Sequence, residues 1–353
     1  MKQLLLSIAI PTYNRAKPLE AQLSSLHKQL SQSLFSSSIE VVVVDNCSDD
    51  STQDLIKDYS AKEKEYTFSS YKNTKNIGSD LNFGQAIIRS QGIFSWVLSD
   101  DDVLCEGAVD NIYKSLRANQ EVGFCFVNYY LGLGESTAIN LNNGDVLAKN
   151  ISEYISSTMF AESMISACIF RQSLLSETIL TKVQKGGGYL HMSWVHNILE
   201  NHHAWVITKP LFTVIHPGVF DSRKNAALRE DKIDFYLEAH LDFLKVLSYV
   251  QKSSLSLRLR LKIQRLALNE NLNQILFHKI TTKHWGYKFS AMKLALPIML
   301  RKFYFNPTFW IFHVPLLLLP SSFARIAEPW RWKYLDSRYF LGKKIKKIIN
   351  YLG

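Results

Sequence analysis

The sequence predicts an α/β fold in which a mostly parallel central sheet is flanked by helices. Apolar runs rich in β-branched residues alternate with helical patterns along the first 130 residues, which is typical of parallel α/β sheets. The runs at 4–10, 39–46 and 94–98 lead into polar residues, in PTYNR, DNCSDD (whose first two residues end the second run) and SDDD. Because ligands of such sheets bind at the carboxyl ends of the strands, we expect a site where these runs end.

Each element of this prediction follows from a local pattern. Residues 4–10 (LLLSIAI) form an apolar strand that ends at Pro11, and leucines recur at helical spacing within 16–35. Residues 39–46 (IEVVVVDN) suit a strand that is covered on both faces. The segment SDDSTQDLIKDY then opens with residues that favour a helix start. Further along, FSWVLSDDD and EVGFCFVNYY predict two more strands.

The pattern is more mixed after residue 140. The segment ISEYISSTMFAESMISACIF predicts a helix, and HAWVITKPLFTVIH predicts a strand. Beyond residue 221 the chain predicts helices.

Composition limits the class of protein. The chain has 353 residues, of which 47% are hydrophobic, enough for one large domain or two smaller ones. Its four cysteines lie far apart without a CxxC pair, so neither a disulfide framework nor a zinc knuckle is indicated and a reducing compartment fits. The N-terminal residues carry no signal-peptide cleavage site, so we expect a cytoplasmic protein.

The basic excess lies at the C-terminal end. The net charge is +10, and residues 281–353 hold thirteen Lys or Arg residues against two acidic ones. This placement argues against a general nucleic-acid binder and for a localised anionic partner. The same region holds four of the seven tryptophans, and its longest apolar run, 309–319, is too short for a spanning helix of about twenty residues. We expect peripheral attachment to a membrane surface, or alternatively a helical subdomain with a solvated basic face.

The stretch from Trp96 to Leu104 (WVLSDDDVL) delivers three adjacent aspartates to a strand end. Adjacent carboxylates repel one another, and their hard oxygens suit Mg²⁺ or Mn²⁺. The alternative is a helix N-cap, because acidic residues before VLCEGAVDNIYKSL would interact favourably with a helix dipole. The neighbouring motifs favour the cation site.

Together, SIAIPTYNRAKPLEAQLSSL, IEVVVVDNCSDDSTQDLI and NIGSDLNFGQAIIRSQGIFSWVLSDDDVL resemble the nucleotide-sugar glycosyltransferases of family 2. The resemblance covers about residues 4–130 and implies the GT-A fold, a Rossmann-like arrangement. The pattern is most similar to a bacterial subgroup that includes abequosyltransferases of O-antigen assembly. No GxGxxG follows the first strand, which sets aside a dinucleotide-binding oxidoreductase.

The resemblance implies roles for individual residues. The loop after the first strand wraps the nucleotide, the second strand ends at a carboxylate that contacts base or ribose, and a later segment closes over the donor. The residues implied for nucleotide-sugar binding are Pro11, Thr12, Tyr13, Asp45, Asn76, Gly78 and Asp100. Asp101 and Asp102 match the later positions of the family's metal-binding motif, while Ser99 replaces its first aspartate.

An inverting transferase also needs a base that takes the proton of the acceptor hydroxyl. The family usually supplies an acid from an ED-like motif after a glycine-rich segment, but KGGGYLHMSWVH has no acidic pair. His191 falls at about the position of that acid, and an imidazole is able to act near neutral pH; alternatively it holds the acceptor or caps the helix that follows. His216 in TVIHPG is a candidate metal ligand or a turn residue.

The resemblance, together with the aspartates that suit a cation, implies an inverting glycosyltransferase dependent on Mg²⁺ or Mn²⁺. It would serve bacterial surface-polysaccharide assembly and act on a lipid-linked saccharide at the cytoplasmic face of the inner membrane, although transfer to a protein or a free glycan stays open. We expect a GT-A domain at 1–220, with a nucleotide-sugar half at 1–130 and an acceptor half at 131–220. A helical extension at 221–280 and a basic, aromatic region at 281–353 would follow. The alternative is a non-catalytic nucleotide-sugar-binding subunit of a membrane assembly complex.

Overall fold

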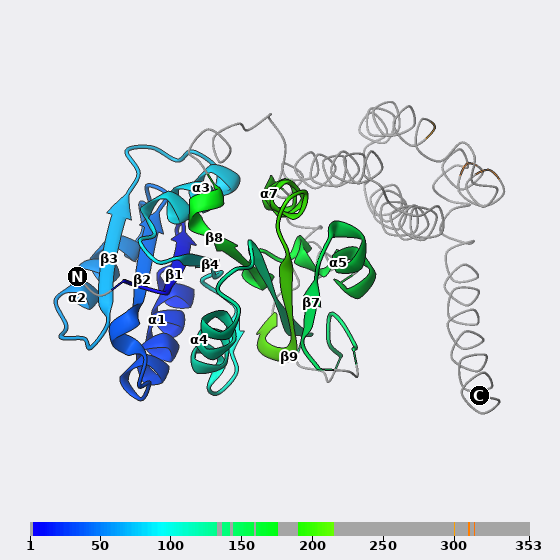
Figure 1. Ribbon diagram of the computed structural model, residues 1–353. Coiled ribbons are helices and arrows are strands. Elements are labelled where there is room, and N and C mark those ends of the chain that lie inside the picture. Colours follow the sequence, from blue (N-terminus) through cyan, green and yellow to red (C-terminus); the bar gives the residue numbers. More distant parts are fainter. Residues whose placement is uncertain are drawn as a thin grey trace. The chain divides into compact units, whose positions relative to one another are not determined.

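The structure is a computed structural model, and it describes residues 3–132, 136–141, 144–158, 160–175 and 190–214, with the single residues 300, 310 and 314 (Figure 1). The helical extension predicted at 221–280 lies outside these residues, as does nearly all of the basic region at 281–353. Within the described part, no helix is both long enough and apolar enough to cross a membrane.

A nine-stranded sheet organises the described part of the chain. Its order is β3-β2-β1-β4-β8-β6-β9-β5, and β7 is added to β9. The strands are β1 Leu6–Thr12, β2 Ile39–Asp45, β3 Thr67–Lys72, β4 Phe94–Val97, β5 Val103–Leu104, β6 Phe124–Leu131, β7 Val146–Ala148, β8 Cys168–Arg171 and β9 Ala204–Val214. The α-helices are α1 Ala16–Ser31, α2 Thr52–Ser60, α3 Ser79–Arg89, α4 Ala108–Ala118, α5 Ile151–Thr158 and α7 Leu190–Leu199.

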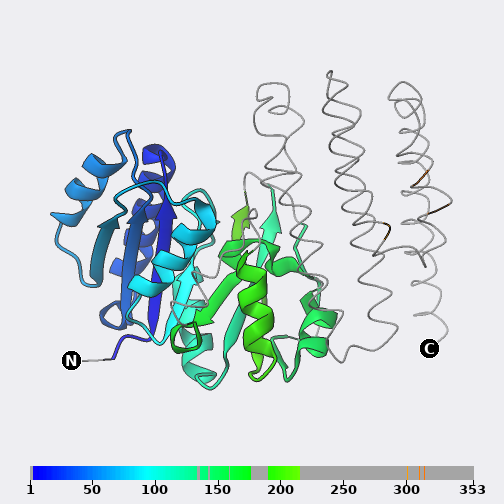
Figure 2. The ribbon, with the colours of Figure 1, turned by 90° about the horizontal axis from the view of Figure 1, so that it is seen from above.

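The first four strands of this order are parallel. β1 pairs with β2 as far as Thr12↔Asp45 and with β4 as far as Ala9↔Val97, and β3 lies parallel to β2. The connections from β1 to β2 and from β2 to β3 run in one direction, and that from β3 to β4 runs back. Right-handed connections therefore put α1 and α2 on one face and α3 on the other, and Figure 2 shows helices on both faces of this part of the sheet.

The rest of the sheet is mixed, which corrects the prediction of a mostly parallel one. β8 pairs antiparallel with both β4 and β6, and β5 and β7 pair antiparallel with β9, while β6 and β9 are parallel. The predicted helix at 151–170 is wrong in its second half, because α5 ends at Thr158 and β8 begins at Cys168. Three buried apolar residues in a row suit a central strand as well as a helix.

The start of β4 is fixed by a buried polar cluster. Glu40, at the start of β2, accepts hydrogen bonds from the Ser7 hydroxyl and the backbone N–H of Gln91. The N–H of Gly92 donates to Ser7 Oγ at 2.7 Å. A side chain at Gly92 would lie within 3 Å of the backbone of β1, so glycine permits this close approach. The cluster thereby sets where β4 begins and where the aspartates that follow it are placed.

Candidate active site

Three strand ends meet at one edge of the sheet. Thr12 and Asp45 are register partners at the ends of β1 and β2, and the run from Ser99 to Asp102 follows the adjacent β4. The carboxyl ends of parallel neighbours lie on the same edge, where ligands of α/β sheets bind. The prediction that these polar clusters converge is therefore confirmed by the fold.

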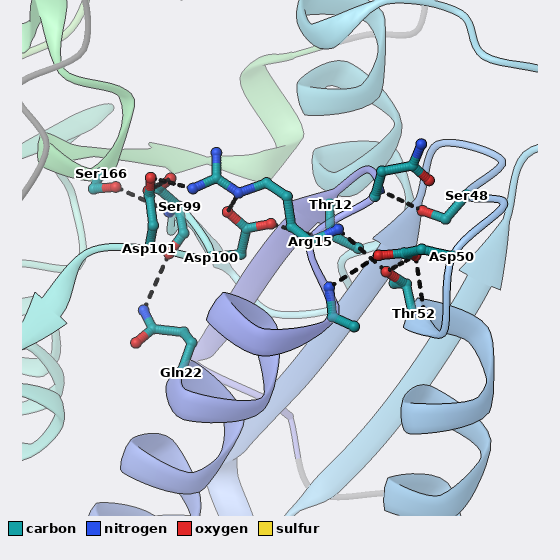
Figure 3. Close-up of polar contacts among 12 residues, drawn as sticks. Thr12, Arg15, Gln22, Ser48, Asp50, Thr52, Ser99, Asp100, Asp101 and Ser166 are labelled. Atoms are coloured by element: carbon teal, nitrogen blue, oxygen red, sulfur yellow. Dashed lines mark hydrogen bonds and ion pairs between the residues drawn. The ribbon is translucent and has the colours of Figure 1, made fainter. Parts of the chain in front are cut away.

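Thr12 at the end of β1, Arg15 in the loop that follows and the neighbouring Ser99 contact the aspartates (Figure 3). The Thr12 hydroxyl donates to Asp100 Oδ2 at 2.7 Å. The Arg15 guanidinium spans two carboxylates, with Nε 3.0 Å from Asp100 Oδ1 and a terminal nitrogen on Asp101. The Ser99 hydroxyl donates to the other oxygen of Asp101 at 2.6 Å. Ser99, which replaces the family's first aspartate, thus positions Asp101.

Asp102 is the least compensated of the three aspartates. Its side chain is 4% exposed, and Oδ2 is buried without a hydrogen-bond partner among the described residues. Burial raises its pKa to about 7, which the hydrogen bond with Ser166 only partly offsets. Burial also raises the pKa of Asp100 to about 6, against the lowering effect of Arg15 and Thr12. Burial therefore disfavours the charged forms of Asp100 and Asp102, and a further cation nearby would stabilise them.

Asp45 is engaged within its own turn. The buried carboxylate accepts hydrogen bonds from the backbone N–H of Ser48 at 3.0 Å, from the Ser48 hydroxyl and from the amide of Gln53. The bonded N–H lies three residues on, one more than in an Asx turn, so the carboxylate holds a slightly longer turn at the end of the strand. Its predicted contact with base or ribose stays a prediction, and a nucleotide would bind beside these bonds or replace one of them.

The loops after β1 and β2 are fastened to each other. The backbone N–H of Asn14 donates to Ser48 Oγ at 2.8 Å, and the N–H of Asp49 donates to Asn14 Oδ1 at 2.9 Å. The N–H of Arg15 donates to Thr52 Oγ1 at 3.3 Å (Figure 3). Pro11 is buried within β1, and Tyr13, in the loop after it, is 40% exposed.

Asparagines tie a third segment to the end of β2. Asn46 donates from Nδ2 to Asn76 Oδ1 at 2.8 Å. Its Oδ1 accepts from the Asn73 amide and from the backbone N–H of Ile77, both at 3.0 Å. Gly78, at φ 86°, then adopts the left-handed backbone from which α3 begins. The structure thus brings Asn76 and Gly78 beside the end of β2, and their role in closing over the donor stays a prediction.

His191 lies in α7 and contacts the backbone of residues 162 and 163. Its side chain is 1% exposed, and Nε2 lies 3.0 Å from the carbonyl oxygen of Glu162 and 3.2 Å from that of Ser163. Two carbonyl partners require the proton on Nε2. Burial lowers the pKa of this imidazole to about 4, despite the nearby Glu162. His216 lies outside the described residues.

Comparison with known proteins identifies the family of the segment that contains these strand ends. Residues 7–166 match glycosyl transferase family 2. They form a family 2 glycosyl transferase domain. The domain holds every described residue that the sequence predicts for nucleotide-sugar or metal binding, and His191 lies beyond its end.

Curated relatives match this chain over part of its length and of theirs. Abequosyltransferase RfbV of Salmonella typhimurium is 30% identical over 122 residues, which is 35% of this chain and 35% of the relative. The GalNAc(5)-diNAcBac-PP-undecaprenol beta-1,3-glucosyltransferase of Campylobacter jejuni is 28% identical over 123 residues, 35% of this chain and 37% of the relative. The chain thus matches only about a third of these relatives' own length.

Solved structures share the fold. TarS 1–349 of S. aureus in complex with UDP-GlcNAc superposes with a TM-score of 0.56 at 17% identity, over 85% of this chain and 79% of that one. The mannosyltransferase PcManGT of Pyrobaculum calidifontis, in complex with GDP-Man and Mn²⁺, has a TM-score of 0.50 at 15% identity, over 86% and 84% of the two chains. The fold is therefore GT-A-like, with a mixed sheet and helices.

Three contacts of the family 2 domain were not anticipated from the sequence. Arg15 pairs with the aspartates, Asn46 holds the 73–77 segment, and Ser166 Oγ accepts from the N–H of Ser99 at 2.9 Å. Asn46 directly follows Asp45, and Arg15 lies two residues after Tyr13 in PTYNR; this closeness to predicted binding residues was the available signal. Ser166 gave none, because its partner lies 67 residues away.

The aspartate cluster fits a divalent ion that arrives with a diphosphate. Among the described residues, no three His, Cys, Asp or Glu side chains are grouped as ligands of one ion. Mg²⁺ is commonly held by one or two carboxylates, with phosphate oxygens and water completing its shell. Asp102 offers a buried oxygen without a hydrogen-bond partner, and the Asp101 side chain is 23% exposed. These two residues would hold such an ion.

Proposed function

We propose that this protein is an inverting glycosyltransferase that uses Mg²⁺ or Mn²⁺. It would transfer a sugar from a nucleotide-diphosphate donor to a saccharide acceptor in bacterial surface-polysaccharide assembly. The observation that carries the proposal is the cluster of Asp100, Asp101 and Asp102 at the joint carboxyl edge of β1, β2 and β4, within a family 2 domain. A divalent ion bound there would neutralise the charge that develops on the leaving diphosphate.

Different residues of the site would contact different parts of the donor. The exposed ring of Tyr13 is available to pack against the base, and Asp45 lies at the strand end where the ribose would lie. Asn76 and Gly78 would close over the sugar. The Thr12 hydroxyl would keep Asp100 oriented toward the donor, at the 2.7 Å distance that it has now. Asp101 and Asp102, with His216 as a further candidate, would hold the ion.

His191 is the proposed base. Its Nε2 is committed to the carbonyl oxygens of Glu162 and Ser163, so Nδ1 is the atom that would accept the proton of the acceptor hydroxyl. The burial of the ring and its pKa of about 4 support a second role. In that role the imidazole positions the 162–166 segment, whose Ser166 contacts Ser99 and Asp102.

The acceptor is proposed to be a lipid-linked saccharide at the cytoplasmic face of the inner membrane. The basic, tryptophan-rich composition of residues 281–353 supports attachment to an anionic membrane surface. The name of the Campylobacter jejuni relative includes a PP-undecaprenol acceptor. In this arrangement residues 1–130 would bind the donor and 131–220 the acceptor. Residues 221–280 would connect them to the membrane-binding region.

The test is a screen of UDP-, GDP- and CDP-sugars for binding and for slow hydrolysis, with Mn²⁺, with Mg²⁺ or with EDTA. The wild type is compared with Asp101→Ala and with Asp58→Ala, an exposed aspartate of α2. We expect one class of donor to be hydrolysed only with metal, and Asp101→Ala alone to lose this activity. Equal binding with EDTA and an unaffected Asp101→Ala would refute the metal-dependent transferase. Donor binding without turnover, with a lipid-linked acceptor present, would instead favour the non-catalytic subunit.

A further inference from the structure

Arg15 lies where a cation is needed. Its guanidinium contacts Asp100 through Nε at 3.0 Å and Asp101 through a terminal nitrogen. Among the residues that the structure describes, these are the only ion pairs of the three aspartates. Burial by itself would lower the pKa of Arg15, but attraction by the aspartates outweighs this and raises it. Arg15 is therefore the positive charge that makes this cluster tolerable when no other cation is bound.

The backbone of Arg15 is held by hydrogen bonds, while its side chain is partly exposed to solvent. The N–H of Arg15 donates to Thr52 Oγ1, and its carbonyl accepts from the N–H of Leu19 in the first turn of α1. The side chain keeps 41% of its surface exposed. A long side chain on an anchored backbone is able to change partners by rotation about its own bonds, without movement of the loop. The new partner would be an anion that enters the same edge of the sheet.

We propose that Arg15 is a resident cation that a divalent ion and a diphosphate displace together. This inference rests on the metal-dependent transferase proposed above. While Arg15 pairs with Asp100 and Asp101, a metal ion without nucleotide has to compete with the guanidinium for these two carboxylates. A diphosphate offers the guanidinium anionic oxygens that two of its N–H groups are able to bind at once. Arg15 then releases the aspartates to the ion and binds the diphosphate, so that metal binding depends on the nucleotide.

The experiment measures Mn²⁺ binding by electron paramagnetic resonance, since free and bound Mn²⁺ give different signals. Wild type, Arg15→Gln and Arg15→Lys are titrated with Mn²⁺ alone and with Mn²⁺ in the presence of UDP or GDP. Lys17→Gln is the matched control, because it removes one positive charge from an exposed position in the first turn of α1. Thermal unfolding of each variant verifies that it is folded.

We expect the wild type to bind Mn²⁺ weakly alone and more tightly with the nucleotide. Arg15→Gln should bind Mn²⁺ alone about tenfold more tightly than the wild type and lose most of the gain from nucleotide, because a nearby unit charge is removed. Arg15→Lys keeps the charge and should stay close to the wild type with Mn²⁺ alone. Lys17→Gln should match the wild type throughout.

The outcomes separate this inference from the function on which it rests. If the wild type binds Mn²⁺ with nucleotide but Arg15→Gln binds Mn²⁺ alone no more tightly, the competition is refuted and the metal site stands. The competition is also refuted if Arg15→Lys behaves like Arg15→Gln, since charge would then not be the cause. If the wild type binds nucleotide but never Mn²⁺, the metal dependence of the proposed function fails, and Arg15 is a permanent substitute for the ion.

Discussion

Replacing Asp102 with asparagine is expected to stabilise the protein while it weakens metal binding. The carboxylate is buried, and its pKa of about 7 in the folded protein lies above the ordinary value of 3.8. Between these values the folded protein keeps a proton that the unfolded chain has released. The free energy of unfolding therefore falls as pH rises from about 4 to about 7 and stays lowered above pH 7.

The magnitude follows from the two pKa values. Their difference corresponds to about 4 kcal/mol at pH 8, at 1.36 kcal/mol for each pH unit. Asparagine carries no charge, but its amide would lack a partner where Oδ2 now lies, which costs about 1 kcal/mol at every pH. We expect Asp102→Asn to be more stable than the wild type by about 3 kcal/mol at pH 8 and slightly less stable at pH 4.

Urea unfolding with EDTA at pH 4, 6 and 8 measures this difference. Asp58→Asn, on the exposed side of α2, is the control for loss of a surface carboxylate and should change little with pH. Addition of Mn²⁺ and the donor's nucleoside diphosphate should then stabilise the wild type at pH 8 and leave Asp102→Asn almost unchanged. A variant whose stability relative to the wild type is the same at pH 4 and pH 8 would refute the account of a buried, uncompensated carboxylate.

Three further substitutions test other parts of the site. Asp45→Asn should lower the free energy of unfolding by about 2 kcal/mol, because the new amide group would face hydrogen-bond donors. Urea unfolding measures this loss, and an equal loss in Asp54→Asn, at an exposed position of α2, would contradict the reasoning. Gly78→Ala should cost about 1 to 3 kcal/mol through its positive φ alone and raise the donor KM, whereas Gly144→Ala, also at positive φ, should leave the KM unchanged. If His191 is the base, His191→Gln should lower kcat about 100-fold and abolish the fall in rate below about pH 4 in the pH–rate profile. A smaller loss of kcat with an unchanged profile would mean that His191 only positions the 162–166 segment.

The first part of the sheet was largely predictable from sequence. β1, β2 and β4 are buried runs whose hydrophobicity depends on covered faces rather than on particular partners. β3 was missed, because its residues are all exposed or half-buried and include two serines, so the segment lacks an apolar run. β8 was mistaken for helix, since four residues are too few to show a period of two.

The partners of the predicted site residues were harder to foresee than the residues themselves. Asp100 was placed by its strand, but its contact with Arg15 joins positions 85 apart and depends on the rotation of one long side chain. The Asn46 amide contacts a segment about 30 residues away, and a sequence gives no sign of which amide faces which. His191 was placed from the missing acidic pair of a family motif, and its burial depends on the packing of α7, which lies outside the family 2 domain.

The pairing of β4 on its two edges has a consequence for the exchange of parts between transferases. One edge of β4 is parallel to β1 and the other is antiparallel to β8, so the aspartates follow a strand on the border between two kinds of sheet. A chimaera joined after Asp102 would keep the loops that surround these aspartates and receive a new second half. It would still depend on a hydroxyl at position 166, because Ser166 bonds both Ser99 and Asp102 across the border. Recombination is therefore expected to change the acceptor without loss of the donor site only when the incoming half supplies that hydroxyl.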